Sequence, residues 1–184
     1  IYQTQKEFRF LYSGMSYMYD NEEAFPCKRM SDRLYLEDRI RFFLNVPTWM
    51  DYIRKAELSV GARLHGNVIA TLAGTPSILI PKDARMREIA EFHNLTHVTA
   101  DKISDDTELL ELFARLDIHS AEKVHAENFR NYKDFLDRNG IDHIWKNGAP
   151  EIAPLDRALA GRTLCPPVGT LTGCNGAEIA HRLD

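Results

Sequence analysis

The sequence has few cysteines, no excess of basic residues and no long apolar run. Its 184 residues include only Cys27, Cys165 and Cys174, and these form no CxxC pair. An odd cysteine count without metal-ligand spacing argues against a disulfide framework and favours a reducing compartment, so we expect a cytoplasmic protein. No apolar run approaches the roughly 18 residues that a membrane-spanning helix needs, and no signal peptide is visible.

The charge balance and composition exclude further classes. Lys and Arg number 23 against 27 Asp and Glu, which gives a net charge of −4. A weakly acidic chain is a poor candidate for general nucleic-acid binding, because such binding needs clustered basic side chains. Hydrophobic residues make up 44% and charged residues 27%, values that are ordinary for a globular protein.

Several well-known motifs are absent. The chain has no GxGxxG, GxxxxGK[ST] or GxSxG segment, so the common nucleotide-binding loops and the nucleophile elbow do not occur. The histidine pair with HxxxH spacing, His93 and His97, falls at the end of one predicted helix and in the predicted strand after it, so the two side chains do not share a helix face. We therefore expect no metal site and no cofactor.

Short apolar segments alternate with amphipathic segments along most of the chain. The pattern predicts strands at 39–44, 57–61, 77–80 and 96–99 and helices at 47–54, 65–73, 84–93, 105–116 and 120–138. Residues 1–4 suggest a further strand, and residues 5–18 fit either a helix or a strand. This alternation is typical of an α/β fold with a parallel sheet, helices on both faces and strand 57–61 in its interior.

The last part of the chain has a different composition. Residues 141–184 hold half of all Gly and Pro and have no aromatic residue after Trp145. We therefore predict two parts, 1–140 as the α/β lobe and 141–184 as an extended C-terminal tail without a core of its own. The chain begins with Ile1 rather than Met, and we expect it to be a piece of a longer protein.

The most informative stretch runs from Leu58 to Asn67 and reads LSVGARLHGN. We expect the strand to end near Gly61 and the helix to start near His65. Arg63 and His65 then lie at the carboxyl end of a parallel strand, where open α/β sheets bind ligands. The first helical turn offers unpaired N–H groups and the positive end of the helix dipole. Beside Arg63, this turn predicts a site for a phosphate or a carboxylate.

Neighbouring residues extend this candidate site. Gly66 lets a ligand approach the backbone closely, and Asn67 beside it is a further substrate-binding candidate. Lys82 and Arg85 follow the next strand at the same sheet edge and add positive charge to the predicted pocket. Asp83 is expected to cap the helix that follows it rather than to bind a ligand.

Arg63 and His65 also have ordinary structural explanations. Arg63 alone would fit an ion pair, and His65 alone would fit a hydrogen-bonded histidine in the core. Their combination at a strand-to-helix turn, with glycine on both sides, favours a binding site.

This region resembles the polysaccharide pyruvyl transferase family. The likeness runs from about Arg39 to Val98, about a third of the chain, and includes Trp49 and the segments VGARLHG, AGTP and KDAR. Members of that family resemble two-lobed glycosyltransferase-B proteins. The resemblance therefore implies that this chain holds the Rossmann-like C-terminal lobe.

The resemblance also implies a reaction. The family transfers the enolpyruvyl group of phosphoenolpyruvate to two hydroxyls of a cell-surface polysaccharide or its lipid-linked precursor, which forms a cyclic ketal. It assigns Arg63, Leu64 and His65 to the phosphoenolpyruvate pocket, with His65 as proton donor. It implies an N-terminal half without which this part is inactive, and a homo-oligomer is a further expectation.

Two other classes remain open at this point. The same helix N-terminus could hold the diphosphate of a nucleotide sugar, as in a glycosyltransferase lobe. Alternatively, the lobe could be non-catalytic and serve assembly with partner proteins. The presence of both Arg63 and His65 argues against the second alternative without excluding it.

Overall fold

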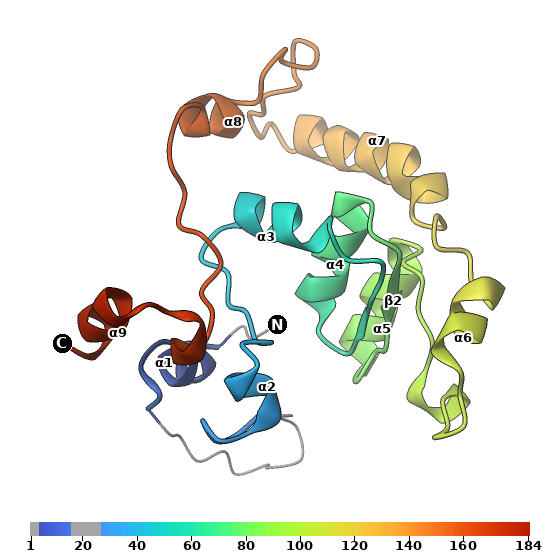
Figure 1. The fold of residues 1–184 in the computed structure, drawn as a ribbon. Helices are drawn as coiled ribbons and strands as arrows, with labels where there is room; N and C mark the ends of the chain where they lie inside the picture. The colour runs from blue at the N-terminus through green and yellow to red at the C-terminus, as the bar shows by residue number, and fades with distance from the viewer. Residues whose placement is uncertain (1–3, 16–26) are drawn as a thin grey trace. The chain divides into compact units, whose positions relative to one another are not determined.

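The computed structural model describes residues 4–15 and 27–184. Its elements in chain order, shown in Figure 1, are α1 (Gln5–Ser13), α2 (Arg33–Leu36), α3 (Val46–Ile53), β1 (Ser59–Gly61), α4 (Leu64–Ala73), β2 (Ser77–Leu79), α5 (Ala84–Phe92), η2 (Ala100–Lys102), α6 (Leu109–Arg115), α7 (Glu122–Arg138), α8 (Pro154–Leu159), η3 (Leu171–Gly173) and α9 (Gly176–Leu183). The strand that we expected at residues 1–4 lies almost wholly outside the described residues. The segment 5–18, left open between helix and strand, is helical over the length of α1.

The chain forms two compact units. Unit 1 combines Ile1–Tyr52 with Leu164–Asp184, and unit 2 consists of Ile53–Thr163. The boundary predicted at residue 140 coincides with neither edge of these units, and the domain division stays a prediction. The candidate site lies within unit 2.

The sheet in unit 2 is small and parallel. β1 pairs with β2 in the register Ser59 to Ser77, Val60 to Ile78 and Gly61 to Leu79. A single parallel bridge joins Leu79 to His97 on the other side of β2. The fold is therefore helix-rich with a parallel sheet, as an α/β class predicts. Among the described residues β2 is the central strand, so the prediction that strand 57–61 lies in the interior is wrong.

The helices beside these strands begin and end where the sequence signals them. α4 ends at Gly74, whose φ of 78° is in the left-handed region that glycine adopts readily. α5 starts after Asp83, whose side chain accepts a hydrogen bond from the Met86 N–H. Leu79, Met86 and Ala90 form a buried cluster, so one face of α5 is held against β2.

The segment 39–44 is not a strand, which corrects the sequence prediction. Its ladder contact within residues 4–15 and 27–184 is an antiparallel bridge between Phe42 and Val168, in which each N–H donates to the other's carbonyl. The run of Arg39 to Leu44 is apolar enough for a strand, but an extended segment needs a neighbouring strand along its whole length. Phe42 instead packs against the core of unit 1.

The core of unit 1 is aromatic and includes a residue from the C-terminal part of the chain. Phe10, Leu11, Tyr35 and Val168 belong to one buried cluster. The Tyr35 hydroxyl is 3.4 Å from both the Leu11 carbonyl, to which it donates, and the Leu171 N–H, from which it accepts. Residues from 164 onward therefore complete the core of unit 1 and do not form one of their own.

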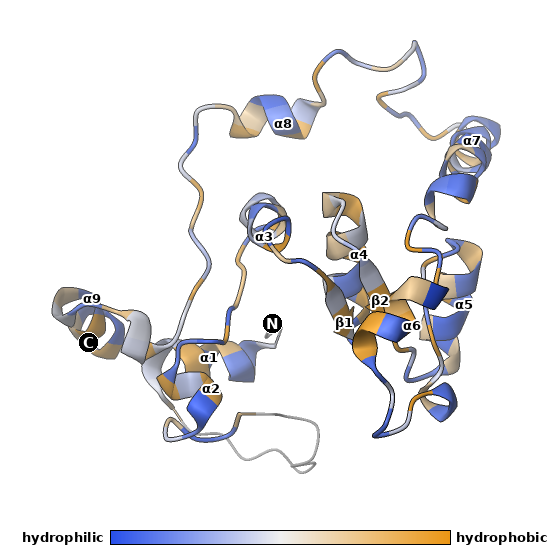
Figure 2. Ribbon diagram, turned by 45° about the vertical axis from the view of Figure 1, so that its right-hand side comes forward, coloured by the Kyte–Doolittle hydropathy of each residue, from blue (hydrophilic) through white to orange (hydrophobic). Residues whose placement is uncertain are grey.

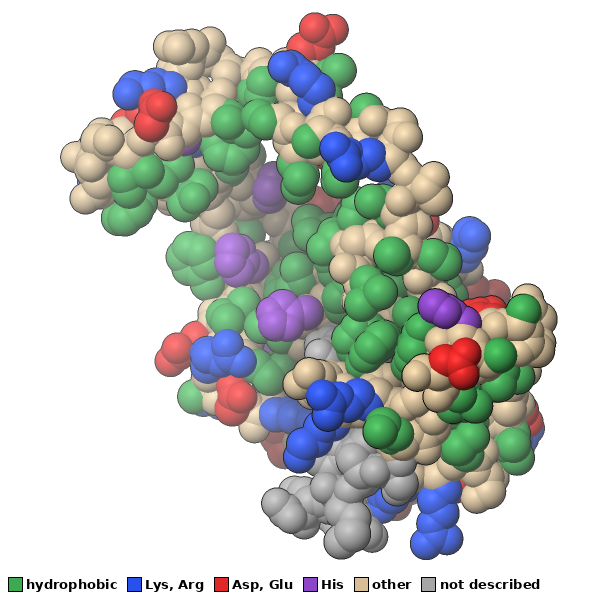
Figure 3. All heavy atoms as spheres, turned by 90° about the vertical axis from the view of Figure 1, so that its left-hand side faces the viewer, with side chains coloured by type: hydrophobic (Ala, Val, Ile, Leu, Met, Phe, Trp, Pro, Cys, Tyr) green, Lys and Arg blue, Asp and Glu red, His purple; other side chains and the backbone are tan. Residues whose placement is uncertain are grey.

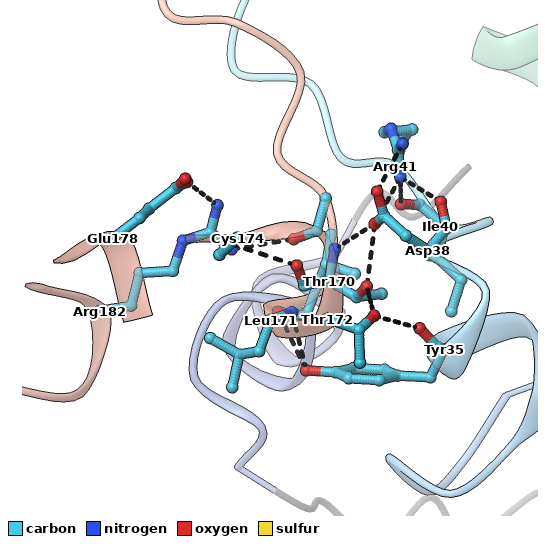
Figure 4. A network of polar contacts seen from close by, with 12 residues as sticks. Tyr35, Asp38, Ile40, Arg41, Thr170, Leu171, Thr172, Cys174, Glu178 and Arg182 are labelled. Atoms are coloured by element: carbon cyan, nitrogen blue, oxygen red, sulfur yellow. Dashed lines mark hydrogen bonds and ion pairs between the residues drawn. The ribbon is translucent and has the colours of Figure 1, made fainter. Parts of the chain in front are cut away.

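The half-buried carboxylate of Asp38 holds the C-terminal segment through Thr170, as Figure 4 shows. Asp38 accepts hydrogen bonds from the Thr170 N–H at 2.8 Å and from the Thr170 hydroxyl at 2.9 Å. Its two carboxylate oxygens also pair with the Arg41 guanidinium, both at 2.8 Å. A Cβ on Gly169 would lie only 2.7 Å from an Asp38 oxygen, so glycine is required for this close approach.

These contacts decide the charge state of Asp38. Burial alone would raise the pKa of its carboxyl group, but the hydrogen bonds from Thr170 and Arg41 outweigh burial and leave the pKa lowered. Asp38 is therefore ionised near neutral pH. Arg182 is likewise compensated, because it pairs with Glu178 at 2.6 Å and donates to the Gly169 carbonyl.

Apolar surface stays exposed in both units. The face of the molecule in Figure 3 shows broad hydrophobic areas between charged side chains. α7 differs, because Figure 2 shows it as mostly hydrophilic. The large exposed apolar residues include Leu36 and Leu44 in unit 1 and Leu72 and Phe92 in unit 2. Among the described residues, no helix combines the length and the apolar composition that crossing a membrane requires.

Candidate functional site

The candidate site is the turn that connects β1 to α4. β1 ends at Gly61, and α4 begins at Leu64 with Arg63 as its N-cap residue in an extended conformation (φ −100°, ψ 106°). This turn lies at the carboxyl end of a parallel strand, the edge where open α/β sheets bind ligands. Arg63, Leu64, His65 and Gly66 thus follow β1 directly and lie at the start of α4. Whether their side chains share one ligand stays a prediction.

The N-terminus of α4 is not capped by the side chain of its own N-cap residue. Arg63 makes no side-chain capping bond, and the first turn has no acidic residue. The first N–H groups of a helix have no partner within it, and the helix dipole makes this end positive. The N-terminus of α4 thus has the electrostatics of an anion site, with an arginine as its first flanking residue.

The individual side chains of this turn differ in exposure. Arg63 and Gly66 are half-buried, and His65 is exposed to solvent. Leu64 is also half-buried and packs against the cluster of Leu79, Met86 and Ala90. Leu64 thus holds the first turn of α4 on the core, while the exposed His65 stays accessible to a molecule in solution.

Asn67 has a different position from the one that a substrate-binding residue needs. It is 4% exposed, and its Nδ2 donates to the Gly61 carbonyl at 2.8 Å and to the Arg63 carbonyl at 3.1 Å. Its Oδ1 accepts from the Ser59 hydroxyl at 3.2 Å and the Ser77 hydroxyl at 3.1 Å. The amide therefore ties β1, β2 and the turn together beneath the surface.

Ser59 and Ser77 are residues that the sequence reasoning missed. They are register partners in the parallel pair and both donate to the same Asn67 oxygen. Ser77 is buried on a strand whose other residues are Ile78 and Leu79. A hydroxyl in such an apolar strand needs a buried hydrogen-bond partner. From the sequence, this requirement could have indicated that Ser77 bonds to a buried polar side chain.

The second basic cluster lies on the neighbouring turn. Lys82 lines a small notch of about 290 Å³ together with Asp83, Arg87, Thr99 and Asp101. Two carboxylates therefore share this notch with its two cations. Arg85 is exposed and does not line the notch, and neither Arg63 nor His65 does. The structure does not bring Lys82 and Arg85 into one described cavity with Arg63.

The largest of the cavities described here has another character. It measures about 660 Å³ and lies between α4, α5 and α7, with Leu72, Phe92 and Phe129 among its walls. Its lining includes no Lys, Arg, Asp or Glu side chain. Its lining also includes no residue of the Arg63 turn, so this cavity is not the predicted anion site.

Comparison with known proteins bears on the same stretch of chain. A model of the family described as polysaccharide pyruvyl transferase matches residues 3–83, which confirms the resemblance found in the sequence. The matched range includes β1, the Arg63 turn, α4 and β2, and it ends at Asp83. No curated protein and no solved structure matches the chain significantly.

Proposed function

We propose that the chain is part of a pyruvyl transferase that uses phosphoenolpyruvate as donor and forms a pyruvate ketal on a polysaccharide or its lipid-linked precursor. The family match supports a transferase role in pyruvyl transfer. The observation that carries the finer proposal is the N-terminus of α4, where Arg63 is the N-cap residue and its side chain makes no capping hydrogen bond. Phosphoenolpyruvate carries a phosphate and a carboxylate, and both suit such a site.

Donor binding divides between the side chain and the backbone in this proposal. The Arg63 guanidinium binds one anionic group of the donor through two parallel N–H bonds, and the N–H groups of the first turn of α4 bind the same or the second group. Gly66 keeps the approach to the backbone open. Lys82 and Arg85, on the neighbouring turn, attract the anionic donor by their positive charge without direct contact.

The chemistry needs one proton donor at the donor's C3 atom. His65 gives its proton to C3, so C2 becomes electrophilic, and a sugar hydroxyl forms a bond to C2 and releases its proton. The C2–O bond to phosphate then breaks, and phosphate leaves with the bonding electron pair. A second hydroxyl closes the ring at C2, and one of the two released protons returns to His65.

The wider architecture is part of the same proposal. We place β1, α4, β2 and α5 in a Rossmann-like lobe of a glycosyltransferase-B-like enzyme, whose other lobe supplies the opposite wall and the acceptor contacts. The reaction would take place in a reducing compartment, and the lobe alone would bind the donor with little or no turnover. A nucleotide-sugar transferase would use the same helix N-terminus for a diphosphate.

Calorimetry with phosphoenolpyruvate tests the proposal. We expect the wild-type chain to bind phosphoenolpyruvate, and Arg63→Lys to weaken binding by about tenfold or more, because an ammonium group lacks the planar fork. Arg130→Lys on α7 is the matched control and should leave the affinity unchanged, since Arg130 is exposed on another helix. Binding of nucleotide sugars with no response to phosphoenolpyruvate would contradict the proposal and favour a glycosyltransferase.

A further inference from the structure

The Asn67 side chain has no unused hydrogen-bonding capacity for a ligand. An asparagine side chain offers two N–H donors and one carbonyl oxygen with two lone pairs. Both donors have backbone acceptors, and the oxygen has two hydroxyl donors. Because the residue is also almost fully buried, a bound donor could reach Asn67 only after these contacts break.

The four side-chain hydrogen bonds of Asn67 fall into two sets. The oxygen contacts, to Ser59 and Ser77, join the two strands. The nitrogen contacts, to the carbonyls of Gly61 and Arg63, hold the two ends of the turn that leads into α4. The nitrogen set therefore fixes the backbone course through the turn, while the oxygen set stabilises the sheet beneath it.

We propose that Asn67 is a positioning residue for the anion site. By holding the Gly61 and Arg63 carbonyls, it fixes the backbone from which the Arg63 side chain extends and aims the first N–H groups of α4 at a common point. This inference rests on the proposed function, because it assumes that an anion binds at that point. Preorganised donors contribute more to binding than donors that must first be ordered.

The inference explains why an amide is suited to this position. In Asn67→Asp, the introduced carboxylate still accepts from Ser59 and Ser77, but it places an oxygen against the Gly61 and Arg63 carbonyls. In Asn67→Leu, a side chain of similar size loses both sets of contacts without adding charge. Ser77→Ala removes one hydroxyl of the oxygen set and leaves the nitrogen set in place.

The experiment is a titration with inorganic phosphate, followed through the backbone amide signals of Leu64, His65 and Gly66, at a temperature where every variant is folded. We expect wild type and Ser77→Ala to bind with the same affinity, even if Ser77→Ala melts at a lower temperature. Asn67→Leu and Asn67→Asp should each weaken binding by about tenfold or more, since each loses two hydrogen bonds to the turn.

The pH dependence of Asn67→Asp separates positioning from general loss of stability. Burial and the facing carbonyls raise the pKa of the introduced carboxyl group, and its protonated form donates a hydrogen bond to one of them. Relative to wild type at each pH, the affinity of Asn67→Asp should therefore recover as the pH falls from about 8 to about 5. The relative affinity of Asn67→Leu should stay low and constant over the same range.

The outcomes separate this inference from the proposed function. If wild type shows no phosphate-dependent change at the three amides, the anion site itself is wrong. If wild type binds and both Asn67 variants bind equally well, the positioning role is wrong. If Ser77→Ala loses as much affinity as Asn67→Leu, Asn67 acts only through the stability of the sheet, and the inference is again overturned.

Discussion

The N-termini of α4 and α5 hold the same place in the fold but differ in their electrostatics. Each helix follows a strand of the same parallel pair. Asp83 supplies α5 with its own carboxylate, which accepts from the Met86 N–H at 2.8 Å. α4 begins after Arg63, whose side chain makes no capping bond. The topology thus creates two comparable helix N-termini, and the N-cap residue of each decides whether a side chain caps the helix.

Unit 1 uses an internal carboxylate in the same way. Asp38 takes the Thr170 N–H and pairs with Arg41, and Glu178 pairs with Arg182. The cations that line this small polar pocket are therefore each compensated by an acidic neighbour. Positive groups in a pocket do not make a ligand site when the chain supplies its own anions. The first turn of α4, in contrast, contains no acidic residue.

The largest expected effect concerns His65 at the open N-terminus. In the complete enzyme, His65→Asn should lower turnover by roughly 10²- to 10⁴-fold while phosphoenolpyruvate binding stays comparatively intact, because a proton donor is lost. Phosphate release in the presence of a glycan acceptor measures this. His119→Asn, which changes an exposed histidine on another segment, is the control. Lost donor binding with normal turnover would make His65 a positioning residue instead.

Arg63→Asp should convert the open N-terminus into a filled one. Aspartate is a favoured N-cap residue, so α4 should gain up to about 1 kcal/mol of stability, less whatever the lost Arg63 contacts contributed. The same carboxylate should repel an external anion and abolish phosphate binding in a calorimetric titration. Arg63→Gln, which removes charge without adding an anion, should fall between this variant and wild type. Unchanged phosphate binding by Arg63→Asp would contradict the comparison.

The converse change is Asp83→Ala, which should open the N-terminus of α5. Loss of the cap should cost about 1 kcal/mol, measured as a lower melting temperature. Phosphate-dependent shifts should then appear at the amides from Ala84 to Met86, where wild type shows none. Asp83→Asn keeps an acceptor for the Met86 N–H and should retain most of the stability. A variant without new shifts would show that an uncapped helix N-terminus here is insufficient for anion binding.

The smallest effect is the response of unit 1 to acid. The folded-state pKa of Asp38 lies below its ordinary value of 3.8, so its contribution to stability is complete above that pH. The contribution should decrease as the pH falls through the lowered folded-state pKa. The Thr170 amide signal during acid titration reports this release. Asn in place of Asp38 should remove this pH dependence, and an unchanged profile in Asp38→Asn would assign it to another group.

The local elements of unit 2 could be predicted from the sequence because their signals are local. Gly74 and Asp83 mark the end of α4 and the start of α5, and both function in the structure as the sequence indicated. The carboxyl-end position of Arg63 and His65 followed from the strand-to-helix order alone. Whether both side chains contact one ligand stays a prediction.

Long-range contacts could not be predicted in this way. Asp38 and Thr170 are 132 positions apart, and neither has a sequence pattern that names its partner. The segment 39–44 was predicted as a strand from its apolar residues, but among the described residues its strand pairing is limited to the bridge between Phe42 and Val168. Asn67 was predicted to bind substrate from its position beside Gly66, and only the structure identifies its contacts with the turn.

A crystal structure of the protein soaked with phosphoenolpyruvate tests the central claim most directly. The account predicts the donor at the N-terminus of α4, with one of its anionic groups paired with the Arg63 guanidinium and within hydrogen-bond distance of the first N–H groups of the helix. It predicts no donor at the N-terminus of α5, which Asp83 already occupies. A donor bound at the notch of Lys82 and Arg87, with the Arg63 turn empty, would contradict the account.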